Sequence, residues 1–160
     1  MGKAKERDEG GVFARNRKAL HDYEILETHE AGVELKGTEI KSIRTHQVSL
    51  DGSFARIEEG EVVLYNMHVS PYEQGGRYNV DPIRTRKLLL HRREIERLRG
   101  AMTQKRLTLV PLKLYEKHGR AKIELALGRG RREYEKRDRI RKEESDRDLR
   151  QMLRHRQREE

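Results

Sequence analysis

The chain has 160 residues, and its 37 Lys and Arg outnumber its 28 Asp and Glu, which gives a net charge of +9. It contains no cysteine, which excludes disulfide frameworks and thiolate chemistry, and no apolar run of about 18 residues that would span a membrane. The length suits one compact domain with extensions, and the positive charge favours a polyanionic partner such as nucleic acid. Residues 1–15 lack the apolar segment of a secretory signal, so we expect a cytoplasmic protein.

The N-terminal third begins with a polar stretch and continues with an apolar one. Residues 1–11 are polar and rich in glycine, so we expect a flexible arm. Residues 22–35 carry the apolar side chains typical of a strand, and Ala31-Gly32 within them predicts a turn.

A short helix is predicted to follow. Thr38 is a residue type that favours the N-cap position. Helical spacing then points Ile40 and Ile43 toward the core and Lys41 and Arg44 toward solvent.

Two hairpins are predicted in the remainder of the body. The first pairs residues 54–57 with residues 62–69 across a glycine-containing turn, and the second pairs residues 107–115 with residues 121–127. Between them, an exposed loop is predicted over residues 71–79, and apolar residues at helical spacing predict a helix over residues 91–103. Pro111 lacks a backbone donor, so its strand is predicted to be an edge or bulged strand.

These elements amount to about six antiparallel strands with short helices and no alternation of strand and helix. A small antiparallel sheet of this kind closes into a barrel to remove its edges. We therefore predict a mainly β domain over residues 12–130, built as an OB-fold-like closed Greek-key barrel with short flanking helices. An SH3-like barrel is the alternative.

Residues 131–160 have a different composition. They contain no glycine or proline, and 21 of the 30 are charged, 12 basic and nine acidic. So few apolar residues cannot offset the entropy of ordering the segment, yet acid–base pairs at i, i+4, such as Glu143–Arg147, favour helix. We predict a basic tail that is disordered when free and helical when bound, with a solubilising tail as the alternative.

Catalysis is not expected. The seven histidines form no H-E-x-x-H arrangement, and neither a G-x-S-x-G motif nor a P-loop is present. We expect no metal and no cofactor. The basic run Arg84–Lys87 beside an apolar strand predicts phosphate contacts, or, as the alternative, edge-strand charge that prevents aggregation.

Ordered short stretches resemble one known family. They are Asn16-Arg17-Lys18-Ala19, His21-Asp22-Tyr23, Glu30-Ala31-Gly32, Leu35-Lys36-Gly37-Thr38-Glu39-Ile40-Lys41-Ser42-Ile43-Arg44, Asp81-Pro82, Arg84-Thr85-Arg86-Lys87-Leu88-Leu89-Leu90, Leu109-Val110-Pro111-Leu112 and Lys136-Arg137. On these stretches the chain resembles the small protein B family of SsrA-binding proteins. The family binds transfer-messenger RNA in bacterial trans-translation, which rescues stalled ribosomes and tags the unfinished peptide.

The resemblance implies an OB-fold barrel that binds the tRNA-like domain of transfer-messenger RNA, mainly at its D-loop and elbow. Lys41 and Arg44, on the outward face of the predicted helix, join the positions that match RNA-contacting residues of the family. The full set of expected RNA-binding residues is Asn16, Lys18, His21, Glu30, Lys41, Arg44, Lys87, Leu89 and His91. Glu30 would accept hydrogen bonds from base amino or imino groups, as acidic side chains do at exposed base edges.

For the tail, the resemblance implies entry into the empty messenger channel of the ribosome and contact with the decoding centre. The expected ribosome-contacting residues are Tyr134, Lys136, Arg137, Ile140, Arg141, Lys142, Met152 and Leu153. The elongation factor that carries aminoacyl-tRNA is an expected partner in the delivery complex, and the free protein is expected to be a monomer. From the residues alone, a ribosomal or ribosome-assembly RNA-binding protein remains the alternative.

Overall fold

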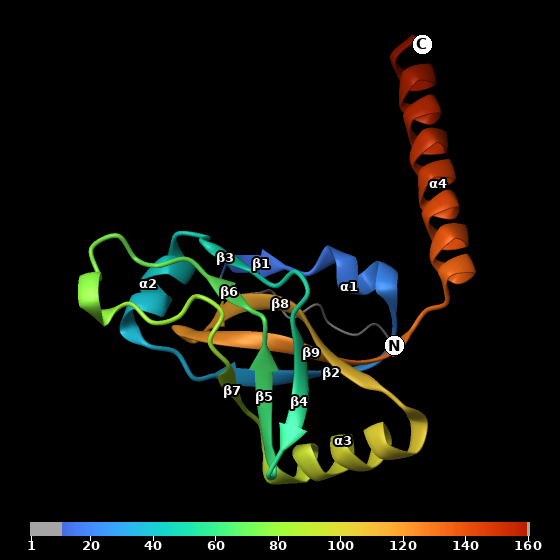
Figure 1. The fold of residues 1–160 in the computed structure, drawn as a ribbon. Coiled ribbons are helices and arrows are strands. Elements are labelled where there is room, and N and C mark those ends of the chain that lie inside the picture. The colour runs from blue at the N-terminus through green and yellow to red at the C-terminus, as the bar shows by residue number, and fades with distance from the viewer. Residues whose placement is uncertain (1–10, 160) are drawn as a thin grey trace.

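The computed structural model describes residues 11–159, without the side chains of residues 133, 134, 158 and 159 (Figure 1). The predicted arm therefore lies outside the described residues except for Gly11, whose carbonyl accepts a hydrogen bond from the backbone N–H of Glu116. The strands are β1 (Val12–Arg15), β2 (Tyr23–Val33), β3 (Val48–Ser49), β4 (Phe54–Glu58), β5 (Glu61–Tyr65), β6 (His68–Val69), β7 (Arg86–Leu89), β8 (Thr108–Lys117) and β9 (Arg120–Gly130). The helices are α1 (Arg17–Asp22), α2 (Gly37–Arg44), η1 (Gly76–Tyr78), α3 (Arg92–Lys105) and α4 (Glu133–Glu159).

Six of the strands form a closed antiparallel ring. The order β8-β4-β5-β7-β2-β9 closes because β9 also pairs with β8, and β1 attaches to β8 beyond the residue that pairs with β4. The short pair β3–β6 lies beside this ring. Closure leaves no long open edge, and the predicted OB-like barrel of about six antiparallel strands with short helices is confirmed.

The barrel is filled by alternate side chains of its strands, because successive residues of a strand point to opposite faces. Leu64, Leu88 and Leu125 are among the fully buried members of this core. Helix α3 adds Leu98, which has no exposed surface, and α2 adds Ile43.

The start of α2 differs from the sequence prediction. Its N-cap is Lys36 rather than Thr38, because the Glu39 side chain reaches back and accepts a hydrogen bond from the Lys36 backbone N–H at 2.9 Å. Ile43 is buried as predicted, whereas Ile40, predicted to face inward, is 37% exposed and lines a surface cleft.

Strands β2 and β9, which pair with each other, are the longest strands of the barrel, with 11 residues each. The turn predicted at Ala31-Gly32 is wrong, since both residues pair with β9 inside the strand. Glycine suits this position for another reason. A Cβ at Gly32 would lie 3.2 Å from Cβ of Leu89, so a larger residue would require Leu89 to move by a few tenths of an ångström.

Both predicted hairpins are present, as β4–β5 and β8–β9. The register of β8 against β9 shifts between Pro111 and Lys113, so the predicted bulge in the proline-containing strand is confirmed.

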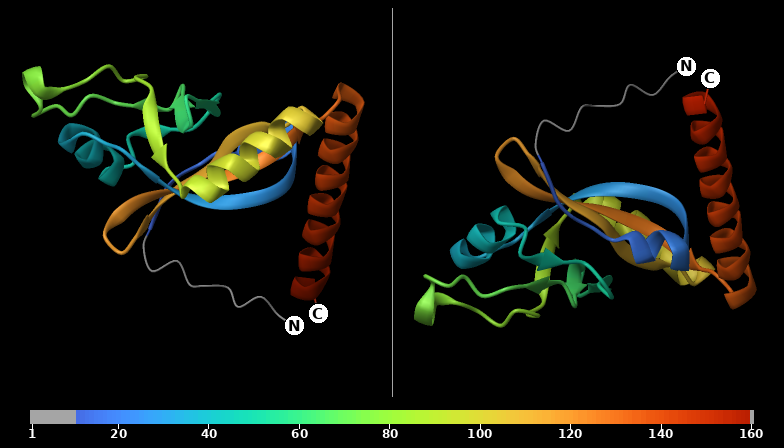
Figure 2. Two further views of the ribbon diagram at one scale, coloured as in Figure 1. Left: turned by 90° about the horizontal axis from the view of Figure 1, so that it is seen from below. Right: turned by 90° about the horizontal axis from the view of Figure 1, so that it is seen from above.

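Helix α4 stands apart from the barrel and points away from it (Figures 1 and 2). It contacts α1 near its own start, where Lys136 Nζ lies 3.8 Å from Asp22 and Glu143 lies 3.7 Å from His21 Nδ1. The helical conformation predicted for the tail is present, and at ~1.5 Å per residue its 27 residues extend about 40 Å. Loss of this order in the free protein stays a prediction.

Candidate RNA-binding surface

Seven of the nine expected RNA-binding residues lie in two groups at the two ends of β2, and the other two, Lys41 and Arg44, lie on α2. Asn16, Lys18 and His21 lie on and before α1, where β2 begins; we call them the α1 patch. The second group, which we call the Glu30 patch, consists of Glu30, Lys87, Leu89 and His91 near the end of β2 and along β7. From Tyr23 to Glu30 the strand advances roughly 23 Å at ~3.3 Å per residue. A ligand that contacts both patches must therefore be large.

In the α1 patch, Asn16 is buried and stabilises the fold. It is 3% exposed, its Nδ2 donates to the Pro111 carbonyl at 2.9 Å, and its Oδ1 accepts from the Ala19 backbone N–H at 3.2 Å. Asn16 is thus the N-cap of α1 and ties the helix to β8. Lys18 is exposed on the same helix, and the His21 side chain is 39% exposed.

The Glu30 patch combines a carboxylate, an apolar side chain and a cation. Leu89 is 52% exposed, which is unusual for a leucine in a barrel strand. Lys87 Nζ bonds Glu61 at 2.8 Å, and this bond raises the pKa of the lysine. His91 is exposed at the N-cap of α3 and makes no side-chain cap bond.

Two residues of β8, which the sequence did not single out, hold the Glu30 carboxylate. The Tyr115 hydroxyl donates to Oε2 at 2.5 Å, and Lys117 Nζ donates to the same oxygen at 3.2 Å. The Tyr115 bond is the main cause that lowers the pKa of Glu30, and Lys117 adds to it against a smaller opposing effect of burial. Glu30 is therefore an anion at neutral pH and 39% exposed.

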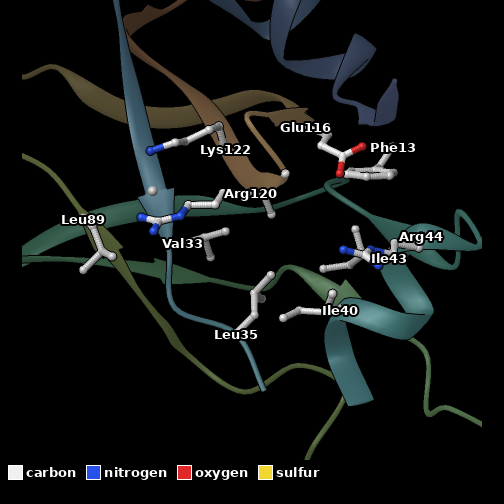
Figure 3. Close-up of a pocket in the computed structure, with 13 residues that line it drawn as sticks. Phe13, Val33, Leu35, Ile40, Ile43, Arg44, Leu89, Glu116, Arg120 and Lys122 are labelled. Atoms are coloured by element: carbon white, nitrogen blue, oxygen red, sulfur yellow. The ribbon is translucent and has the colours of Figure 1, made fainter. Parts of the chain in front are cut away.

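An apolar cleft of about 260 Å³ extends from Leu89 to α2 (Figure 3). Its wall is built by Val33, Leu35 and Ile40, while Arg44 lies on the α2 side. The remaining cations of the lining are Arg120 and Lys122 of β9. Arg44 and Leu89, both expected from the sequence, are thus brought to one cleft. Lys41 lies outside it, with Nζ 5.3 Å from the centre of the Tyr72 ring.

The phosphate contacts predicted for the run Arg84–Lys87 do not extend to Arg86. That side chain has no exposed surface, its Nε bonds Glu39 Oε2 at 2.6 Å, and its Nη1 bonds the Met67 carbonyl at 2.6 Å. Arg84 bonds the other oxygen of Glu39. Burial raises the pKa of Glu39, but the bonds from Arg84, the Lys36 backbone N–H and Arg86 outweigh it and lower that pKa overall.

This buried network positions the functional elements. Glu39 belongs to α2, which carries Lys41 and Arg44, and Arg86 begins β7, which carries Lys87 and Leu89. The network therefore fixes α2 against β7.

The expected ribosome-contacting residues all lie on α4. Ile140, Met152 and Leu153 are 44%, 63% and 52% exposed, so these apolar side chains are available to a partner. Arg137, Arg141 and Lys142 are exposed, and Lys136 faces Asp22. The side chain of Tyr134 lies outside the described part of the structure.

Within residues 11–159, no three His, Cys, Asp or Glu side chains are grouped so that they could hold a metal ion. None of the helices described here is both long and apolar enough to cross a membrane.

Comparison with known proteins places these features in a family. The family model for SmpB protein matches residues 13–155. The SsrA-binding protein of Geobacillus thermodenitrificans is 58% identical over 149 residues, which cover 93% of this chain and 96% of the relative. The SsrA-binding protein of Carboxydothermus hydrogenoformans is 59% identical over 143 residues, 89% of this chain and 96% of the relative.

A solved structure is similar as well. It is described as "tmRNA-SmpB: a journey to the center of the bacterial ribosome", and one of its chains matches with a TM-score of 0.64 and 54% identity over 79% of this chain and 93% of that chain. The present chain belongs to the SmpB protein family.

Proposed function

We propose that this protein is an RNA-binding adaptor that binds the tRNA-like domain of transfer-messenger RNA and delivers it to stalled ribosomes for peptide tagging. The observation that carries the proposal is family membership along nearly the whole chain, with relatives named for SsrA binding. A similar solved structure pairs an SmpB chain with tmRNA and the ribosome. The protein acts by binding rather than by catalysis.

The barrel supplies the RNA recognition. The α1 patch contributes Lys18 and His21 on a helix that Asn16 caps, and the Glu30 patch contributes a carboxylate and Leu89. Lys41, Arg44 and the patch cations, Lys18 and Lys87, supply attraction to phosphates, which is independent of sequence. Two patches about 23 Å apart along β2 suit a folded RNA, because such a ligand presents separated contacts on one rigid surface.

The tail supplies the contact with the ribosome. Apart from the contacts of Lys136 and Glu143 with α1, α4 points away from the barrel (Figure 1), and its apolar residues Ile140, Met152 and Leu153 are exposed. We propose that α4 forms fully in the vacant messenger channel, where ribosomal RNA surrounds it, and that folding and binding are coupled. Tyr134 and the basic residues Lys136, Arg137, Arg141 and Lys142 would lie toward the decoding centre.

The proposed delivery complex includes the elongation factor that carries aminoacyl-tRNA, as the family resemblance implies. The free protein is a monomer and works in the cytoplasm. Residues 12–130 form the RNA-binding barrel, and residues 131–160 form the tail that binds the ribosome.

RNA recovered with the purified protein tests the proposal. Sequencing should find one small RNA with a tRNA-like end enriched over all others. Recovery of ribosomal RNA alone would instead support a ribosomal or ribosome-assembly protein. A variant that lacks residues 131–160 is the control, because it should recover the same small RNA without ribosomal RNA.

A further inference from the structure

We propose that Tyr115 and Lys117 are positioning residues that hold Glu30 so that one carboxylate oxygen, Oε1, accepts an N–H group from a base edge of the bound RNA. This inference rests on the proposed function and assigns two residues that act through Glu30 without contacting the base.

Tyr115 reaches Glu30 across the strand that separates them. Tyr115 belongs to β8 and Glu30 to β2, and β9 lies between these two strands. Neighbouring strands are about 4.8 Å apart, so β8 and β2 are roughly 10 Å apart at this place. A tyrosine is long enough to carry its hydroxyl across the middle strand. Its ring is 7% exposed and lies beneath Lys113 Nζ, 5.0 Å from the ring centre, which fixes its direction.

The Glu30 carboxylate has more acceptor sites than Tyr115 and Lys117 occupy. An ionised carboxylate offers about four lone-pair sites, two on each oxygen. Tyr115 and Lys117 both donate to Oε2, which uses the two sites of that oxygen. Among residues 11–159, no hydrogen-bond donor reaches Oε1. Within the described part of the chain, the carboxylate is therefore held through Oε2, and Oε1 is left for a further donor.

Neighbouring lysines compensate the negative charge of Glu30. A free carboxylate on an RNA-binding face repels phosphates. Here Lys117 of β8 and Lys122 of β9 both act on Glu30 and lower its pKa, while Glu124 of β9 lies opposite it in the ladder and bonds Lys113 at 3.9 Å. The lysines offset the repulsion, so the oxygen can approach a base edge. Base amino and imino groups donate N–H to carboxylates in this way.

The test uses the full chain and the tRNA-like domain of transfer-messenger RNA as the probe. Tyr115→Phe removes one hydroxyl and keeps the buried ring, and we expect the dissociation constant to rise about three- to tenfold. Combined with Glu30→Ala, it should have no further effect, because its whole effect passes through Glu30. Lys117→Gln should weaken binding in the same non-additive way, and it replaces Tyr115→Phe if that variant does not fold.

A second readout separates positioning from folding. The side-chain carboxyl carbon of Glu30, followed by NMR against pH, should titrate at higher pH in Tyr115→Phe, because the lost bond is the main cause of its lowered pKa. Tyr65→Phe is the matched control. Its hydroxyl bonds Glu58 within the β4–β5 hairpin, so its removal should change neither the affinity nor the titration of Glu30.

The outcomes distinguish the two proposals. Full affinity in Tyr115→Phe together with a loss in Glu30→Ala, or additive losses in the double variant, would overturn the positioning role and leave the proposed function standing. Full affinity in Glu30→Ala would overturn it too. If the unchanged protein does not bind the RNA, the proposed function itself fails.

Discussion

The barrel and α4 are made from the same charged chain, yet they keep their structures by different means. In the barrel, fully buried residues such as Leu64, Leu125 and Leu98 come from distant segments and exclude water together. In α4, the apolar side chains Ile140, Leu149, Met152 and Leu153 are all 44% exposed or more.

The charged side chains of the barrel and of α4 also differ in burial. The barrel uses a buried cluster, Glu39 with Arg84 and Arg86, to join α2 to β7. In α4, Arg139 and Glu143 form a pair at 3.3 Å within one exposed helix, and such pairs contribute little to stability. The barrel is therefore specified by its own buried contacts, whereas α4 depends on what surrounds it.

The largest effect is expected from removal of residues 131–160, which leaves the barrel without α4. We expect peptide tagging on stalled ribosomes to be abolished, while the affinity for free tRNA-like RNA stays nearly unchanged, because the barrel holds both patches. Tagging is measured in a reconstituted translation reaction, and affinity by filter binding. A large loss of affinity would contradict this division of labour.

The sequence predicted the regular parts of the barrel well. The β8–β9 hairpin and α3 follow from local patterns, since strand alternation, a glycine turn and helical spacing all act within a few residues. The glycine at position 32 was misinterpreted as a turn because its cause, the approach of Leu89, lies 57 residues away.

The candidate site was predicted in part for the same reason. Family motifs identified Glu30 and Leu89, but no pattern identified Tyr115 and Lys117 as partners of Glu30, because β9 must first align β8 with β2. Their alternate spacing on one strand face was the available signal. The burial of Arg86 was missed because a basic run looks the same whether its charges face solvent or a buried carboxylate.

The next largest effect is expected when the buried network of Glu39, Arg84 and Arg86 is disrupted. Glu39→Ala leaves Arg86 without its carboxylate partner in a site with no exposed surface, and we expect a loss of about 3–5 kcal/mol in the free energy of unfolding by urea denaturation. Glu96→Ala is the control, since its partner Arg92 has a side chain 93% exposed, and we expect a change of at most about 1 kcal/mol. Equal losses would show that the Glu39 cluster does not join α2 to β7.

The same network predicts a pH dependence. The pKa of Glu39 is lowered in the folded state, so its contribution to stability is present above the ordinary carboxyl pKa and is lost as the pH falls through the lowered value. The difference in unfolding free energy between the unchanged protein and Glu39→Gln should therefore shrink in acid. A difference that is constant from neutral pH to strongly acidic pH would contradict the ionised state of Glu39.

A smaller effect concerns the phosphate contacts of the barrel. RNA binding should weaken as salt rises, and Lys18→Ala should reduce the slope of log K against log salt by about 0.7–0.9, as expected for one lost phosphate contact. Lys105→Ala, at the end of α3, should leave the slope unchanged. A salt-independent dissociation constant in the unchanged protein would exclude phosphate attraction as the source of affinity.

The smallest effect on stability is expected from substitutions in α4. Replacement of both Met152 and Leu153 by serine should change the free energy of unfolding by less than about 0.5 kcal/mol, because both side chains are more than half exposed. Leu125→Ala in the barrel should cost about 2–5 kcal/mol in the same urea titration. The serine variant should nevertheless tag peptides poorly, because these side chains are proposed to pack only inside the ribosome. If it unfolded as easily as Leu125→Ala, the two residues would belong to the core of the free protein, and α4 would not be separate from the barrel.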